Sequence, residues 1–475
     1  MPHLLRSSLV LLLVLWFGAG TALAQGTGRQ VTEPLGAMLA LGDADAHDDH
    51  AHDENDHDDH AHDDHDQGEH HHEEPAYDDH AHGEPEHDDH AHDEHEHGEP
   101  EHDDHDHVHG TEGTRLLVAS LDGPEMIVLD AEAGTVVGRF TVPGPGTAHQ
   151  LPNAQLAAVV HRETNRVTFV HSGLTTIDHG DHADLLVGSP YVLSTVNLGR
   201  EPSTLFAAGN DIAVWLAGDG GAAWLDARLL GVSLDFVEVA GPGVGSVARS
   251  GVVAAVDGHL VVAGADGAAV RVHDRRANEV AAFGGCPAPQ GQAVLGDVAA
   301  FGCSDGVLLV QSAGGGVFTS HKIAHPPGGP ADARVRTLVA HAGGPLVVGG
   351  FGQGVALIDV VTRTARTVPL PAEPTGMRLA EDGEVLLVLT KDGYLHALDP
   401  ASGAVDASVR VTGGAAAGEA RPSLATLGGA VFVADPEHRE IVRVDVDHME
   451  VEARWPLPFT PGSLAAMGIE GAIRH

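Results

Sequence analysis

Ile127-Val128-Leu129-Asp130 is the first copy of a short apolar strand that ends in an aspartate, and the recurrence of this pattern decides the fold. The later copies are Ala223-Trp224-Leu225-Asp226, Val270-Arg271-Val272-His273-Asp274, Ala356-Leu357-Ile358-Asp359, Leu395-His396-Ala397-Leu398-Asp399 and Val442-Arg443-Val444-Asp445. Successive terminal aspartates lie 96, 48, 85, 40 and 46 residues apart, so seven steps of 45 residues cover the 315 residues from Asp130 to Asp445. A period of this length is the mark of a repeat architecture.

Each repeat also contains further strands on either side of the quoted one. Apolar runs precede it at 116–121, 260–263 and 385–389 and follow it at 136–142 and 405–411, without helical periodicity. Sheets of about four strands repeated in this way predict an all-β fold, a single β-propeller. Eight blades are favoured, with 463–467 as the inner strand of the first blade. The alternative is seven blades with an insertion around 173–195. The terminal aspartates are interpreted as turn residues.

The chain divides by composition into three parts: a signal peptide (1–24), a tail (25–112) and the propeller (113–475). Arg6, a short apolar run and the small-x-small pattern before Gln25 predict export and cleavage after Ala24. The apolar run is short for a membrane span, and a retained anchor is the alternative. No later segment is apolar for long enough to cross a bilayer. We therefore expect a periplasmic or extracellular protein with no membrane span in the mature chain.

The tail has an extreme composition. Residues 43–112 contain no Lys or Arg but hold 30 of the 69 acidic residues and 21 of the 36 histidines. Nucleic acid is an unlikely partner for such a charge, because polyphosphate binding needs Lys and Arg. A cation is the expected partner. With few large apolar side chains, the segment is predicted to be disordered when free of metal.

The tail histidines recur in an Asp-Asp-His-Ala-His unit that suits metal binding. Neutral imidazole and carboxylate are good ligands for four-coordinate Zn²⁺. Residues 43–112 lack Cys and Met, which leaves Zn²⁺, Ni²⁺ and Cu²⁺ as candidate metals, with zinc favoured here. The alternatives are a solvated acidic tail without a function and a cloning tag. The predicted tail ligands are His50, His52, His60, His62, His80, His82, His90, His92, His105, His107 and His109.

Two further groups stand out within the propeller. Cys286 and Cys303 are 17 residues apart in a chain with an export signal, which predicts one disulfide; two free buried thiols are the alternative. His179, Asp181 and His182 occupy a polar, turn-rich stretch where loop residues can converge on an ion. We predict a metal site there, against a loop that only satisfies backbone groups. Five isolated histidines are interpreted as structural: His149, His161, His171, His341 and His438.

These features together resemble the AztD-type periplasmic zinc metallochaperones. The signal peptide matches, as do the tail ending His105-Asp106-His107-Val108-His109-Gly110 and the segment Asp178-His179-Gly180-Asp181-His182-Ala183-Asp184. Cys286-Pro287 with Gly291 and Cys303, and the run Lys391-Asp392-Gly393-Tyr394-Leu395-His396-Ala397-Leu398-Asp399, match as well. The resemblance covers most of the chain after Arg115. It implies a propeller that passes zinc to the substrate-binding protein of an ABC importer.

The sequence departs from this family at two positions. Gln290 stands where the family has a histidine before the glycine of the Cys-Pro loop, and Pro202-Ser203-Thr204-Leu205 replaces Pro-Ser-His-Phe. An amide and a hydroxyl are poor substitutes for imidazole, so the family's metal site within the propeller is in doubt.

Three functions are compatible with this pattern. The first is zinc collection by the tail with delivery by the propeller, and the second is a metal-buffering scaffold without directed transfer. The third, a propeller enzyme, is disfavoured, because we find no Gly-x-Ser-x-Gly, dinucleotide, haem-attachment or His-Glu-x-x-His motif. We therefore expect a binding protein, not an enzyme.

Overall fold

The structure is a computed structural model of the chain, and it describes residues 30–31, 113–178, 183–240, 251–264, 269–327, 333–341, 343–380, 383–414, 422–427 and 429–469. The chain divides into two compact units, one formed by residues 1–36 and 109–475 and the other by residues 37–108. All the described residues belong to the first unit, which is the subject below.

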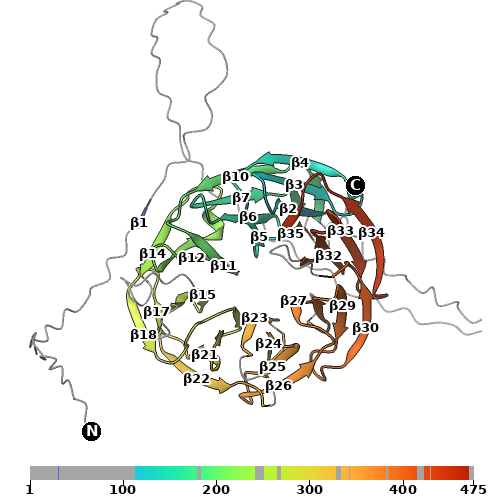
Figure 1. Cartoon of the computed structure of the whole chain (residues 1–475). Helices are drawn as coiled ribbons and strands as arrows, with labels where there is room; N and C mark the ends of the chain where they lie inside the picture. Colours follow the sequence, from blue (N-terminus) through green and yellow to red (C-terminus); the bar gives the residue numbers. More distant parts are fainter. Residues whose placement is uncertain are drawn as a thin grey trace, which may run out of the picture. The chain divides into compact units, whose positions relative to one another are not determined.

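Eight antiparallel sheets follow one another around a central axis, with the first strand of each sheet innermost (Figure 1). This is an eight-bladed β-propeller, as the repeat predicted. Blade 1 consists of β35 (Pro461–Gly468), β2 (Thr114–Ser120), β3 (Glu125–Asp130) and β4 (Val136–Thr141). Blade 2 consists of β5 (Thr147–Gln150), β6 (Leu156–His161), β7 (Arg166–His171) and β10 (Tyr191–Val196).

The next three blades continue the same order. Blade 3 consists of β11 (Pro202–Ala208), β12 (Asp211–Leu216), β13 (Gly221–Asp226) and β14 (Phe236–Ala240), with β1 (Gln30–Val31) added at its outer edge. Blade 4 consists of β15 (Gly251–Val256), β16 (His259–Gly264), β17 (Val270–His273) and β18 (Glu279–Phe283). Blade 5 consists of β19 (Gln292–Leu295), β20 (Val298–Cys303), β21 (Gly306–Ser312) and β22 (Phe318–Ala324).

The last three blades complete the ring. Blade 6 consists of β23 (Val335–Ala340), β24 (Leu346–Phe351), β25 (Gly354–Asp359) and β26 (Thr364–Pro369). Blade 7 consists of β27 (Pro374–Leu379), β28 (Leu386–Thr390), β29 (Tyr394–Leu398) and β30 (Val405–Arg410). Blade 8 consists of β31 (Ser423–Leu427), β32 (Ala430–Asp435), β33 (Glu440–Asp445) and β34 (Glu450–Pro456).

The ring closes through the C-terminal strand. β35 pairs with β2 in antiparallel register from Thr114 opposite Gly468 to Ser120 opposite Pro461, so the two ends of the repeat share one blade. This confirms the expectation that the run 463–467 supplies the inner strand of the first blade. Closure removes the free edges that an open row of sheets would expose.

Burial explains why the strands differ in sequence. The second and third strands of a blade lie between neighbouring blades and read as continuous apolar runs; β2 and β32 are buried at every residue. The outermost strands alternate instead, as in β34, whose residues are exposed at every second position. The blade cores are filled by large side chains such as Trp215, Trp224 and Phe169.

The aspartates that end the third strands lie in turns. Oδ1 of Asp130 accepts hydrogen bonds from the backbone amides of Glu132 and Ala133, at 3.1 and 2.9 Å. The same carboxylate-to-amide pattern occurs at Asp226, Asp274, Asp359, Asp399 and Asp445. These side chains satisfy amides that the strand ladder leaves free, which fits the turn interpretation.

The propeller has two faces that the strand order defines. We letter the four strands of a blade A to D from the innermost to the outermost. The face that carries the A-to-B and C-to-D connections is called the A–B face, and the opposite face, which carries the B-to-C connections, is called the B–C face. In blade 2 the third-to-fourth connection is extended by a separate two-stranded sheet, β8 (Leu174–Asp178) and β9 (Ala183–Val187). The insertion suspected around 173–195 is therefore present, but inside an eight-bladed ring.

The described residues contain one short 3₁₀ helix, Ala227–Leu229, and among them no helix is of a length and apolarity that would cross a membrane. Cys286 and Cys303 form a disulfide, as predicted, with their Cα atoms 5.0 Å apart. It ties the connection between blades 4 and 5 to the end of β20 on the B–C face.

Candidate functional site

All the metal ligands proposed from the sequence lie outside the described residues. This holds for the tail histidines from His50 to His109, and equally for His179, Asp181 and His182, which stand between β8 and β9. The signal peptide lies outside them as well. The structure does describe the strands that flank these segments.

The flanking strands meet on the A–B face. β2, which follows the tail, begins at Thr114 on this face, and the β8–β9 hairpin extends from the same face. A Cβ atom placed on Gly113 would lie 2.9 Å from Leu185 Cδ2 in β9. The amide of Ile469, at the end of β35, donates to the carbonyl of Gly113 at 3.4 Å. Gly113, which follows the histidine-rich segment in the sequence, therefore lies directly against the hairpin.

Glycine at position 113 permits this close approach. Its φ of +85° lies in the left-handed region, and a side chain would collide with Leu185. Behind it, the guanidinium of the buried Arg115 donates to the carbonyl of Ser172, which precedes β8. Ser172 Oγ in turn accepts from the amide of Leu174 at 3.2 Å. These contacts fix the first strand after the tail against the base of the hairpin.

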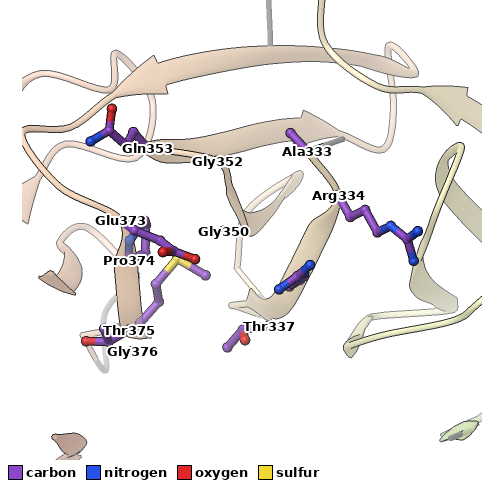
Figure 2. A pocket seen from close by; sticks show the side chains of 12 residues that line it. Ala333, Arg334, Thr337, Gly350, Gly352, Gln353, Glu373, Pro374, Thr375 and Gly376 are labelled. Carbon is purple, nitrogen blue, oxygen red and sulfur yellow. The ribbon is translucent and has the colours of Figure 1, made fainter. Parts of the chain in front are cut away.

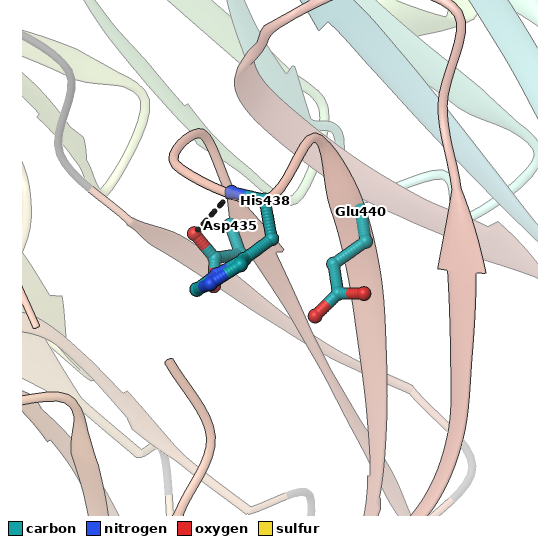
Figure 3. A group of neighbouring side chains, drawn as sticks. All are labelled: Asp435, His438 and Glu440. Atoms are coloured by element: carbon teal, nitrogen blue, oxygen red, sulfur yellow. Dashed lines mark hydrogen bonds and ion pairs between the residues drawn. The ribbon is translucent and has the colours of Figure 1, made fainter. Parts of the chain in front are cut away.

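One group of potential metal ligands comes together within the described part of the chain. A nitrogen of His438 and one carboxylate oxygen each of Asp435 and Glu440 lie within 4.8 Å of one another (Figure 3). The three residues occupy a hairpin of blade 8: Asp435 ends β32, His438 lies in the turn, and Glu440 begins β33 opposite Asp435. From the sequence, His438 is interpreted as structural, and Asp435 and Glu440 are not singled out. The pattern Asp-x-x-His-x-Glu across a hairpin turn could have indicated that these three side chains lie together.

The contacts of this group are those of a turn. Asp435 is almost fully buried and accepts from the amides of Glu437 and His438 at 2.9 and 3.3 Å. Its Oδ2 lies 2.8 Å from His438 Nδ1, and this hydrogen bond, with the carboxylate charge, raises the pKa of His438. A raised pKa favours a proton over a metal ion at the imidazole. Glu440 is paired with Arg454 at 2.5 Å.

A second hairpin of blade 8 supports this interpretation. Asp445 accepts from the amides of Asp447 and His448, and its Oδ2 lies 2.9 Å from His448 Nδ1. The pKa of His448 is raised for the same reason, the hydrogen bond that its imidazole donates to the Asp445 carboxylate. The same Asp-x-x-His contacts occur in two turns of blade 8, which indicates that they stabilise these turns. Asp435, His438 and Glu440 therefore form a weak candidate for a metal site.

Several histidines are integrated into the blades. His161 is fully buried, with Nδ1 2.8 Å from the carbonyl of Gly144 and Nε2 3.0 Å from Thr168 Oγ1. His396 similarly contacts Thr390 and Ser408 at 3.1 and 2.7 Å. Burial lowers the pKa of both imidazoles. Their nitrogens are already hydrogen-bonded, so neither is available as a ligand.

His149 is different, because its Nε2 is buried without a hydrogen-bond partner in the described structure. It lies on β5, an innermost strand. Burial, and secondarily the charge of Arg378, lower the pKa of His149 to about 4. A nearby guanidinium also repels a metal cation, so His149 is a poor zinc ligand despite its free nitrogen.

The two positions that depart from the family pattern lie near the B–C face and are used structurally. Thr204 Oγ1 donates to the carbonyl of Gly251 at 3.3 Å. The backbone amide of Gln290 donates to the carbonyl of Gly302 at 2.8 Å, next to the disulfide. Neither position presents an imidazole at the mouth of the ring.

Comparison with known proteins places this architecture among its relatives. The family profile described as outer membrane protein assembly factor BamB (PQQ_2) matches residues 202–409. The zinc chaperone AztD of Citrobacter koseri is 26% identical over 382 residues, which cover 76% of this chain and 87% of that protein.

Solved structures give the same picture for the fold. The structure of apo AztD from Citrobacter koseri matches with a TM-score of 0.68 at 23% identity, covering 76% of this chain and 99% of that one. Dihydro-heme d1 dehydrogenase NirN matches with a TM-score of 0.51 at 14% identity, over 74% of each chain. At these identities the structural matches concern the fold alone. Taken with the sequence match, they show that the chain is similar in sequence to the zinc chaperone AztD and shares its propeller fold.

Proposed function

We propose that this protein is a periplasmic zinc chaperone that collects zinc with its histidine-rich tail and delivers it to the substrate-binding protein of an ABC-type zinc importer. The observation that carries the proposal is the homology to a zinc chaperone over most of the chain. The composition supports the proposal, because residues 43–112 contain 21 histidines interleaved with acidic residues and contain no Lys or Arg.

The proposed ligands fall into two groups, and each group adjoins, in the sequence, a described segment of the A–B face. His105, His107 and His109 lie within eight residues of Gly113 in the sequence, a span of at most roughly 29 Å for an extended chain. Gly113 lies against Leu185, which is three residues after His182. We propose that zinc passes from the last tail histidines to the site at His179, Asp181 and His182. Zinc held by imidazole and carboxylate in either group would have the ligand types it prefers.

Loose, equivalent tail sites suit capture and fast exchange, and the hairpin site suits retention until transfer. The other tail histidines, His50, His52, His60, His62, His80, His82, His90 and His92, would enlarge the capture capacity. The carboxylates around them lower the local potential and attract the cation. No catalytic step is required in this scheme.

Zinc transfer from the full-length protein to the purified importer binding protein of the same organism tests the proposal. The rate is measured against the concentration of the recipient. Direct transfer predicts a rate that rises with recipient concentration and exceeds spontaneous zinc release. A rate that equals spontaneous release at every concentration would mean a buffer without directed transfer. Parallel loading with Ni²⁺ and Cu²⁺ establishes whether zinc is the preferred metal.

Two variants separate the two groups of ligands. Substituting all 21 histidines of residues 43–112 by glutamine should reduce zinc capacity, whereas His179→Gln with His182→Gln should reduce transfer but leave most of the capacity. His448→Gln serves as the matched control, because this imidazole is 76% exposed and lies in a turn of blade 8. Full zinc binding by the tail variant would contradict the assignment of the tail as the collecting element.

A further inference from the structure

A cavity of about 370 Å³ lies between blades 6 and 7 on the B–C face, opposite the face that the tail joins (Figure 2). Its walls are formed by the start of β23, the turn after β24 and the start of β27. The side chains that matter below are Arg334, Arg336 and Thr337 of blade 6 and Glu373 and Met377 of blade 7. Its size is within the range of small-molecule sites.

The backbone of β23 is distorted where it borders this cavity. The pairing with β24 shifts register between Arg336 and Leu338, so Thr337 is bulged out of the ladder. Thr337 has a φ of +50°, a region that β-branched residues rarely adopt. A bulge re-aims neighbouring side chains, and strained residues of this kind gather at functional sites.

The neighbouring segments keep the cavity open and the bulge in place. A Cβ on Gly350 would fit in ordinary van der Waals contact, 3.5 Å from the carbonyl oxygen of Arg336 and 3.9 Å from Met377 Cε, so the missing side chain leaves room for about one methyl group. On the other side, Gly291 of the disulfide loop approaches so closely that a Cβ there would lie 2.7 Å from the amide nitrogen of Thr337. The distorted strand is therefore supported by the loop that Cys286 and Cys303 close.

The charges of the cavity are opposite and separate. Glu373 lies on the wall formed by blade 7, across from Thr337 on blade 6 (Figure 2). Arg336 precedes Thr337 and carries the opposite charge. No salt bridge joins Arg334, Arg336 or Glu373 to any partner within the described ranges, although ten other pairs form there.

We propose that this cavity binds a small zwitterion, an α-amino acid or a short peptide, with its carboxylate on Arg336 and its ammonium group on Glu373. A guanidinium offers two parallel N–H donors that match a carboxylate, and a carboxylate accepts hydrogen bonds from an ammonium group. The threonine hydroxyl and the Met377 side chain supply a polar contact and an apolar surface. The inference is independent of zinc transfer, because none of the described residues that line the cavity is a histidine or a cysteine.

Two simpler ligands fit the cavity less well. A metal cation would meet one carboxylate and two guanidinium groups, so its attraction to Glu373 would be offset by repulsion. A simple anion would be attracted by Arg334 and Arg336 but repelled by Glu373. A ligand that carries both charges can pair with the Arg336 guanidinium and with the Glu373 carboxylate at the same time.

Calorimetric titration of the zinc-free, full-length protein with the twenty α-amino acids and with dipeptides tests the proposal. For the tightest amino acid, two truncated analogues are titrated as well, one lacking the amino group and one lacking the carboxylate. For leucine these are 4-methylpentanoate and 3-methylbutylamine. We expect each analogue to bind about tenfold or more weakly than the parent, since each loses one charge-assisted contact.

Variants identify the cavity as the site. Arg336→Gln and Glu373→Gln should each weaken binding about tenfold or more. Arg139→Gln and Glu238→Gln are the matched controls, because these exposed residues of blades 1 and 3 carry the same charges away from the cavity. Thermal unfolding verifies that all four variants fold. The proposal is overturned if no amino acid or dipeptide binds, or if the analogue that lacks the amino group binds as tightly as its parent amino acid. It is also overturned if the Arg336 and Glu373 variants bind the ligand as tightly as the control variants do.

Discussion

Removing the disulfide tests how the B–C face is held together. In the variant Cys286→Ala with Cys303→Ala, the chain loses a cross-link that closes a 17-residue separation between two residues that are each 1% exposed. In the chain-entropy model a loop of this length contributes about 3 kcal/mol, because the unfolded chain regains the freedom that the cross-link removes.

This free energy corresponds to a small but measurable shift in melting temperature. Unfolding entropy is about 2.1 cal/mol/K per residue, or about 0.76 kcal/mol/K for a propeller of some 360 residues. A loss of about 3 kcal/mol therefore lowers Tm by about 4 °C. Two backbone hydrogen bonds of 2.8 Å, from Ser304 N to Pro287 O and from Gln290 N to Gly302 O, remain and should keep the loop near its position.

Scanning calorimetry of oxidised wild type, reduced wild type and the double-alanine variant is the assay. Reduced wild type separates the loss of the cross-link from the loss of the two buried sulfur atoms. The reduced protein and the variant should both melt about 4 °C below the oxidised protein, and reductant should leave the variant unchanged. If oxidised and reduced protein melt within about 1 °C of each other, the reasoning from loop entropy is wrong for this site.

Three further predictions concern protonation and the tail. Zinc binding by residues 43–112 should be strong at about pH 7.5 and largely lost by about pH 5, because imidazole with a pKa near 6.5 must lose its proton to bind metal; affinity unchanged in titrations at pH 5 would show that carboxylates are the ligands. His149 should remain neutral in NMR titrations down to about pH 5. Arg378→Gln should raise the pKa of His149 but leave it below 6.5, since burial lowers this pKa more than the charge of Arg378 does. A lower pKa of His149 in this variant would refute the contribution of Arg378. The pKa of His438 should lie above that of a free histidine, and Asp435→Asn should lower it, because the raising interaction is lost; NMR titration of both proteins measures this.

Much of the fold could be predicted because local, periodic patterns in the sequence indicate its strands and turns. Each blade repeats an apolar strand that ends in a turn aspartate, and burial between neighbouring blades imposes the same residue types at every repeat. The closing strand could be predicted as well, because one inner strand was missing from the first repeat and an unpaired apolar run remained at the C-terminus. The disulfide could be predicted from two cysteines in a chain whose first residues predict an export signal.

The sequence by itself thus determined the all-β class and the composition of the histidine-rich tail, predicted the closure, and favoured eight blades over seven. Only the tertiary structure decided which distant residues meet. Gly113, at the start of blade 1, lies against Leu185 in the hairpin of blade 2, and Arg336 and Glu373 line one cavity from adjacent blades. The physical reason is that periodicity reports which face of a strand is buried, whereas contacts between blades depend on the closed ring, on a bulge at Thr337 and on glycines whose missing side chains permit close approach.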